Sequence, residues 1–220
     1  MAITMLNSII TSGVTLFIFI AGLCLGPILE KRKDDRKSKA LKADLIEEFN
    51  DEVKERSKTI SKMLICIGTL REFEEIVNDS SFDTEKNAIG FGEGPSYYKP
   101  MNILFYFLIK TIENSFSHLN PVERKELKII NQQVIAINSY LSNMKKPEQH
   151  DKNETDDLIK NYYRYIYTTS CLINSIWIFT KNKNAIMGAS DEEIINNVSK
   201  VLCLGFKYTD IIIRTKVKLI

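Results

Sequence analysis

Apolar residues fill the first part of the chain without interruption. No charged side chain occurs in residues 1–29, and the 27 residues of 3–29 are mostly Ile, Leu, Phe, Val and small residues. A bilayer core about 30 Å thick needs about 20 helical residues, so this stretch is long enough to cross it. It is too long for the apolar core of a cleaved signal peptide, and no Lys or Arg precedes that core. The pattern predicts an uncleaved single-pass membrane anchor over residues 1–29.

A charged segment follows the apolar stretch directly. Residues 30–42 contain seven basic and three acidic side chains. Basic residues beside a spanning helix stay in the cytoplasm, so we expect the N-terminus outside and the C-terminal domain in the cytoplasm. Residues 30–45 would form a basic juxtamembrane stalk that contacts anionic lipid head groups; a plain topology signal without lipid selectivity is the alternative. The candidate head-group contacts are Lys31, Arg32, Lys33, Arg36, Lys37 and Lys39.

Small residues recur at helical spacing inside the predicted anchor. Ser8, Thr15 and Gly22 share roughly one helix face, and Gly22 with Gly26 forms a GxxxG motif. Small side chains allow two helix backbones to approach closely in lipid. These four residues therefore predict a packing face for self-association, with an unpaired span as the alternative.

An apolar repeat with alternating four- and three-residue steps runs through the segment after the stalk. It predicts one long helix over residues 30–77, interrupted only by Arg56 and Glu74 in the repeat. Leu45 and Leu64 broaden the stripe, which favours a bundle within the chain; a coiled-coil homodimer of the proximal half is the alternative. The candidate helix–helix seam consists of Ile46, Phe49, Val53, Ile60 and Met63.

Residues 78–100 are rich in Gly, Pro, Ser, Asn and Asp and have no hydrophobic period. They predict a loop long enough to act as a binding loop or a lid. Apolar spacing then predicts helices over 101–119, 122–144 and 155–181, and a last helix that starts after Ser190 and keeps helical spacing through Gly205. Asn120 and Ser190 are the expected N-caps.

Two segments have ambiguous patterns. Residues 165–180 carry no charge, which is typical of a helix at the centre of a bundle, with a second membrane segment as the alternative. Residues 206–220 end in a strand-like alternation, but a single strand would leave its backbone groups unpaired, so we favour a helix. The predicted fold is all-α, with residues 46–220 forming one helical cytosolic domain.

Composition and charge exclude several function classes. The chain has 30 basic and 28 acidic residues, and this near neutrality argues against a nucleic-acid binder. The tyrosines of residues 162–167 point in several directions on a helix, so we expect packing and no stacking platform. The carboxylates of residues 47–55 alternate with basic residues and predict a solvated face.

Candidate catalytic and metal-binding residues do not form a constellation in the sequence. The four cysteines are scattered through apolar surroundings, which indicates buried reduced thiols. His118 and His150 lack the spacing of helical metal sites. We therefore predict no catalytic residue, no metal and no cofactor. The four cysteines are Cys24, Cys66, Cys171 and Cys203.

Three functions fit these patterns. The first is a membrane-anchored adaptor whose helical bundle recruits or senses a cytosolic protein partner at the bilayer. The second is a membrane effector that self-associates, as a homodimer or larger assembly, and disturbs the bilayer. The third is an enzyme that uses the loop of residues 78–100. The expected partners are the lipid bilayer and a protein that the sequence does not identify.

Overall fold

All regular elements that the structure describes are helices. The computed structural model describes the backbone of residues 2–78, 97–145 and 152–215, and the side chains of residues 28–72, 97–145 and 153–213. Within these residues there is no strand, which confirms the all-α class. The elements are α1 (Ala2–Asn78), α3 (Tyr106–Asn114), the 3-10 helix η1 (Phe116–His118), α4 (Pro121–Asn143), α5 (Lys152–Thr180), α6 (Asp191–Val201) and α7 (Tyr208–Thr215).

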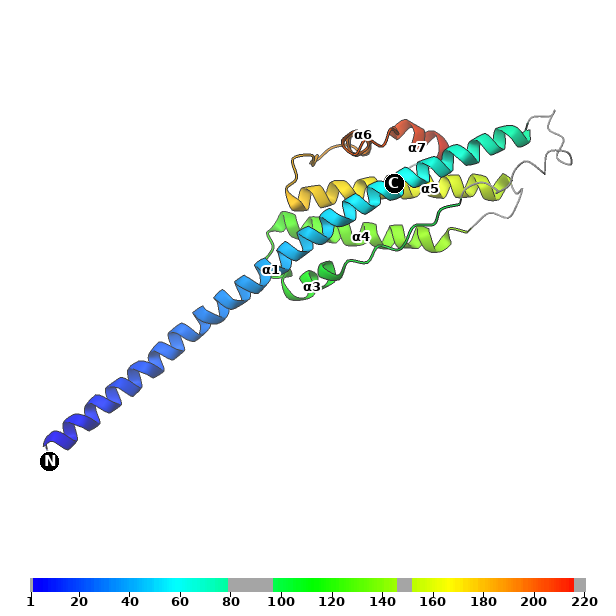
Figure 1. The fold of residues 1–220 in the computed structure, drawn as a ribbon. Coiled ribbons are helices and arrows are strands. Elements are labelled where there is room, and N and C mark those ends of the chain that lie inside the picture. The colour runs from blue at the N-terminus through cyan, green and yellow to red at the C-terminus, as the bar shows by residue number, and fades with distance from the viewer. Residues whose placement is uncertain (1, 79–96, 146–151, 216–220) are drawn as a thin grey trace.

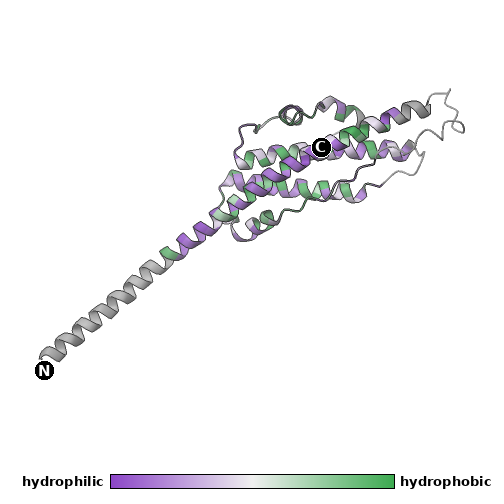
Figure 2. Cartoon of the chain, viewed as in Figure 1, coloured by the Kyte–Doolittle hydropathy of each residue, from purple (hydrophilic) through white to green (hydrophobic). Residues whose placement is uncertain are grey.

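Helix α1 is one continuous rod whose N-terminal part projects away from the other helices (Figure 1). It confirms the long helix predicted for residues 30–77 and joins it to the predicted anchor without a break, through Pro27. Figure 2 shows a hydrophilic stretch where α1 leaves the bundle, at the predicted stalk.

The predicted membrane anchor falls largely outside the described side chains. Among the residues searched, which are those that the structure describes, no helix combines the length and apolar character needed to cross a membrane. The side chains of residues 1–27, with Ser8, Thr15, Gly22 and Gly26, lie outside that set. The anchor and its packing face therefore stay predictions.

Helix α5 forms the centre of the bundle and contacts α1, α4, α6 and α7. Its uncharged stretch is buried there, including Tyr165, Ile173, Trp177 and Phe179. The apolar stripe of α4 packs against it, as the spacing of Leu127 and its successors predicts. Burial among four helices accounts for the missing charges of residues 165–180 and supports the interpretation as a core helix.

Two helices start at the caps that the sequence predicts. The Asn120 side chain accepts a hydrogen bond from the Glu123 amide at 2.9 Å, and the Glu123 carboxylate accepts one from the Asn120 amide at 3.3 Å. Ser190 and Glu193 form the same reciprocal pair at the start of α6. Each pair satisfies amide groups that the first helical turn leaves without partners.

The prediction of a helix over residues 101–119 is wrong at its start. Residues 97–105, which we call the strap, are not helical, and α3 begins only at Tyr106. Ile103 and Phe105 are buried while Leu104 between them is exposed, an alternation typical of extended backbone. The strap takes this conformation because side chains of other helices bind its backbone, which local spacing does not reveal.

The prediction of helical spacing through Gly205 is also wrong. Helix α6 ends at Val201, and Cys203 and Gly205 adopt positive φ values of 53° and 73°, which are incompatible with a right-handed helix. The helix favoured within residues 206–220 is confirmed for α7, and residues 216–220 lie outside the described part.

Candidate interaction surface

The strap is held in place by side chains that substitute for the neighbouring strand of a sheet. The Tyr162 hydroxyl accepts a hydrogen bond from the Tyr98 amide at 3.0 Å and donates one to the Tyr98 carbonyl at 2.9 Å. The Asn138 side chain accepts one from the Ile103 amide at 2.8 Å and donates one to the Ile103 carbonyl at 2.9 Å. The backbone of the strap is thus fixed at two points, from α5 and from α4.

A charged cluster on α1 fixes the strap from the other side. Arg56 is buried, forms an ion pair with Glu52 at 2.6 Å, and donates hydrogen bonds to the Tyr165 hydroxyl at 2.9 Å and the Met101 carbonyl at 3.3 Å. Burial opposes the charge of Arg56, yet Tyr165 and Glu52 raise its pKa. Burial raises the pKa of Glu52 despite the neighbouring guanidinium. Arg56, which interrupts the apolar repeat in the sequence, therefore connects α1, the strap and α5.

Glu48 positions the start of α3. Its carboxylate accepts hydrogen bonds from the Tyr106 amide at 2.7 Å and the Phe107 amide at 3.0 Å. Burial raises the pKa of Glu48, and these backbone hydrogen bonds counteract part of that rise. The prediction that residues 47–55 form a solvated acidic face is therefore wrong for Glu48 and Glu52: Glu48 binds the backbone of α3, and Glu52 pairs with the buried Arg56 one turn further along α1.

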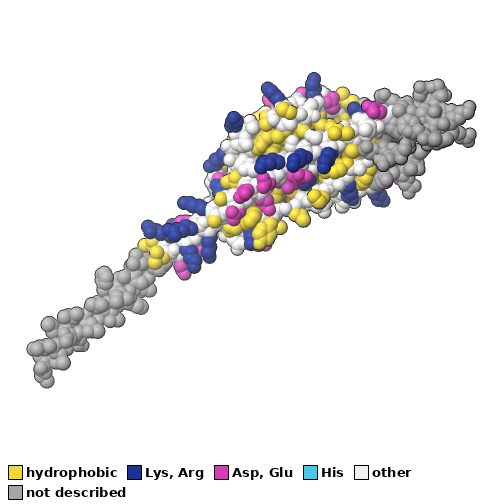
Figure 3. Space-filling model, in the orientation of Figure 1, with side chains coloured by type: hydrophobic (Ala, Val, Ile, Leu, Met, Phe, Trp, Pro, Cys, Tyr) yellow, Lys and Arg dark blue, Asp and Glu magenta, His cyan; other side chains and the backbone are white. Residues whose placement is uncertain are grey.

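Once its backbone is fixed, the strap presents apolar side chains to solvent. Met101 is 77 % exposed, Leu104 is 84 % exposed, and Tyr106 and Ile109 at the start of α3 are 59 % and 57 % exposed. We call these four residues the strap surface. Figure 3 shows hydrophobic side chains next to a row of acidic side chains on α1. Four large apolar side chains exposed within nine residues are typical of a surface that binds another molecule.

The candidate seam on α1 lies inside the chain's own bundle. Phe49, Ile60 and Met63 are fully buried, Val53 is 9 % exposed, and Ile46 packs against the same core. The Phe49 ring meets the rings of Phe105 and Phe179 edge-on, at centroid distances of 5.0 and 5.4 Å. These side chains thus connect α1 to the strap and to α5.

The six candidate head-group residues are exposed on the part of α1 that precedes the bundle. They are Lys31, Arg32, Lys33, Arg36, Lys37 and Lys39. Among the described side chains of α1, long-range polar contacts begin between these residues: the Asp35 carboxylate lies 3.7 Å from His118 Nδ1, and Lys42 Nζ lies 2.6 Å from Glu123 Oε1. The bundle therefore begins within the predicted stalk.

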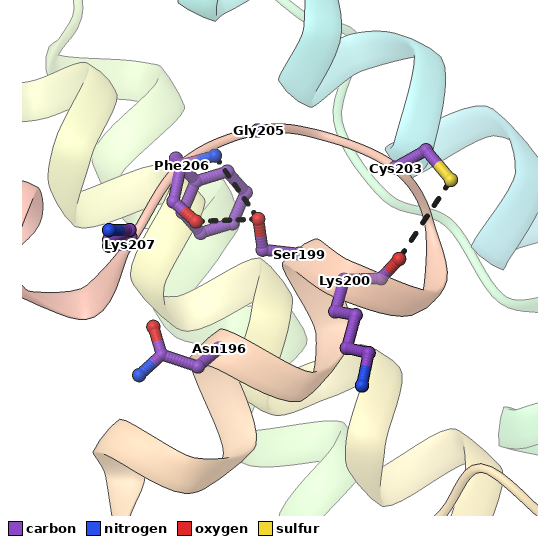
Figure 4. A pocket seen from close by; sticks show the side chains of 7 residues that line it. All are labelled: Asn196, Ser199, Lys200, Cys203, Gly205, Phe206 and Lys207. Atoms are coloured by element: carbon purple, nitrogen blue, oxygen red, sulfur yellow. Dashed lines mark hydrogen bonds between the residues drawn. The ribbon is translucent and has the colours of Figure 1, made fainter.

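The one pocket drawn in close-up lies between α6 and α7 (Figure 4). The Ser199 hydroxyl accepts a hydrogen bond from the Phe206 amide at 3.1 Å and donates one to the Phe206 carbonyl at 2.6 Å, so it shapes the turn. The side chains of Lys200 and Lys207 point apart in Figure 4. This arrangement offers no convergent set of polar groups for a ligand. The lining residues are Asn196, Ser199, Lys200, Cys203, Gly205, Phe206 and Lys207.

The cysteines and the central tyrosines differ in burial. Cys66 is buried and Cys171 is half-buried, and burial raises the pKa of the Cys171 thiol to about 12. Cys203 is exposed, so the prediction of a buried thiol is wrong there, because it sits in the turn that follows α6. Tyr162 and Tyr165 are fully buried, as expected of packing residues. Across the described residues, no group of His, Cys, Asp and Glu is arranged to hold a metal ion.

Comparison with known proteins found no matching family model, no matching curated protein and no matching solved structure.

Proposed function

We propose that this protein is a membrane-anchored adaptor that recruits a cytosolic protein through the strap surface. The observation that carries this proposal is the exposure of Met101, Leu104, Tyr106 and Ile109 on a backbone fixed by other helices. A surface held in one conformation loses little entropy on binding, which favours recognition of a specific partner.

The sequence of α1 supports the membrane part of the proposal. Residues 1–29 supply the anchor, and the six exposed basic residues that follow supply contacts to anionic head groups. A tethered domain is confined to a thin layer at the bilayer, which raises its effective concentration toward other molecules there. Helix α1 runs without interruption from the anchor into the bundle. Helix α1 therefore connects the proposed anchor to the bundle that carries the strap surface.

Site-specific photo-cross-linking in cells tests the adaptor function. A photoreactive amino acid at Leu104 of the full-length protein should give one discrete protein adduct in the membrane fraction. The matched control is Met187, which is also apolar and 68 % exposed but lies in the connection between α5 and α6. Adducts from both positions alike, or from neither, would contradict the proposal.

The anchor is tested separately by membrane fractionation. The full-length protein should stay in the pellet after extraction at alkaline pH, and a chain that begins at Glu30 should be released. A full-length protein that dissolves in the aqueous phase would refute the anchor while leaving the cross-linking result interpretable.

A further inference from the structure

The strap surface has an acidic border on one side. Asp44 and Glu47 on α1 are exposed, and neither makes a salt bridge within the described residues. Asp51 has an ion pair with Lys54 at 2.9 Å, so its charge is largely compensated. Figure 3 shows a row of acidic side chains over α1, between hydrophobic side chains and a row of basic ones. Asp44 and Glu47 lie one turn before and directly before Glu48, which binds the start of α3, so two exposed carboxylates without a salt bridge border the apolar surface.

The other edge of the surface differs in charge. Lys110 lies over the Tyr106 ring, with its ammonium 4.3 Å from the ring centroid, so its charge is directed at that ring. The carboxylate of Glu48, the acidic group nearest to Tyr106, is occupied by the two amides of α3. Asp44 and Glu47 on α1 are therefore the exposed carboxylates next to the contact that Glu48 makes with α3, and Glu113, one turn after Ile109, adds an exposed carboxylate at the far end of α3.

The surface is elongated along α1. The carbonyl of its first residue, Met101, accepts a hydrogen bond from Arg56 of α1, and the Tyr106 amide at the start of α3 donates one to Glu48 of α1. These two residues of α1 are eight positions apart, which corresponds to about 12 Å of helix. An amphipathic helix of two to three turns, with apolar side chains at i, i+3, i+4 and i+7, matches such a surface.

From these observations, and on the basis of the proposed function, we infer that the partner presents an amphipathic helix whose apolar face covers the strap surface and whose basic edge faces Asp44 and Glu47. Charge complementarity selects this occupant over anionic lipid, because the acidic border repels phosphate head groups.

Peptide binding to the full-length protein in nanodiscs of zwitterionic phosphatidylcholine tests this inference. The probe is a synthetic 18-residue helical peptide with Leu at the four stripe positions and Lys along one edge of the stripe. The matched probe carries Glu in place of Lys. Fluorescence anisotropy at 50 and 300 mM salt gives both affinities.

The basic peptide should bind at least about tenfold more tightly than the acidic one, and this preference should shrink at high salt. The double variant Asp44→Lys with Glu47→Lys should reverse the preference. Leu104→Glu should weaken both peptides about tenfold, and Met187→Glu should change neither affinity. These variants lie on the surface, and intrinsic fluorescence of the buried Trp177 confirms that each is folded.

Three outcomes would overturn the inference. The first is equal binding of the two peptides. The second is binding that Leu104→Glu leaves unchanged. The third is displacement of the bound probe by a peptide with the basic and apolar sequence of residues 213–220, which would identify the occupant as a segment of this chain. If Leu104 cross-links a protein in cells but the basic peptide fails, the charge inference is wrong and the adaptor proposal stands. If Leu104 gives no adduct, the adaptor proposal falls whatever the peptides do.

Discussion

Replacing Asn138 by Ala tests whether side chains hold the strap in its extended conformation. The substitution removes the hydrogen bonds at 2.8 and 2.9 Å and leaves both backbone groups of the buried Ile103 without these partners. Each buried polar group left unpaired costs about 1 to 3 kcal/mol, so we expect a loss of about 2 to 4 kcal/mol. For a domain of this size, that corresponds to a fall in melting temperature of about 5 to 15 °C.

Two measurements on the full-length protein in detergent check this prediction. Chemical unfolding followed by the fluorescence of Trp177, the only tryptophan of the chain, gives the change in free energy. Hydrogen exchange of the strap peptide reports whether its amides lose protection more than those of α5. The variant should also bind the basic probe peptide more weakly, although the substituted residue lies outside the strap surface.

The control for this substitution is Gln132→Ala, which changes an exposed amide side chain on the same helix. It should alter stability by less than about 0.5 kcal/mol. If Asn138→Ala cost no more than this control, or if strap exchange were unchanged, the idea that side chains determine the extended conformation would be refuted.

Three further predictions concern other parts of the bundle. Arg56→Ala should lower the free energy of unfolding, measured by chemical denaturation, by about 3 to 5 kcal/mol, because the mostly buried Glu52 carboxylate loses its counter-ion. Burial alone would raise the pKa of Glu123, but the hydrogen bond from Lys42 lowers it below its ordinary value. Glu123→Gln should therefore lower the free energy of unfolding by about 1 kcal/mol above pH 5.5. The difference in stability between the variant and the natural protein should vanish as the pH falls well below 4.5. Gly68→Ala should stabilise α1 by about 0.5 to 1 kcal/mol, whereas Gly205→Ala should destabilise by about 1 kcal/mol because of its φ of 73°.

Each of these has a result that contradicts it. For Arg56, the comparison is Lys58→Ala, an exposed residue of the same helix that should have almost no effect; equal losses would place Arg56 outside the core network. For Glu123, a difference that persists at pH 3 would mean that the effect is not electrostatic. If Gly68→Ala and Gly205→Ala changed the free energy of unfolding in the same direction, the backbone conformation at each glycine would not determine the effect of the substitution.

Periodicity, capping and length were sufficient to predict most of the helices. The stripe that starts at Leu127 is buried, and the capping residues Asn120 and Ser190 start α4 and α6 where expected. These features are local, since each depends on residues within one or two turns. The pattern that predicts a helix over residues 30–77 of α1 is local in the same sense.

The candidate surface was not predictable in the same way. The strap depends on Asn138 and Tyr162, which lie 35 and 64 residues from the backbone groups that they bind. Residues 101–105 are apolar enough to resemble a helix, and the alternation of exposed and buried side chains from Asn102 to Phe105 appears only in the structure. Arg56 is the one residue of this site that the sequence marks, because a charged residue within an apolar stripe indicates polar partners in the core.

In the proposed anchored arrangement, the continuity of α1 would set the distance between the bilayer and the strap surface. With the anchor embedded, the helix rises about 1.5 Å per residue from Leu29, so Glu48 and Arg56 stand roughly 30 and 40 Å above the bilayer edge along its axis. A long helix bends only gently, so this spacing varies little. In the proposed anchored arrangement, α1 would therefore act as a rigid spacer: a partner that lies flat on the head groups would be out of reach, and one that extends several nanometres from the bilayer would be within reach.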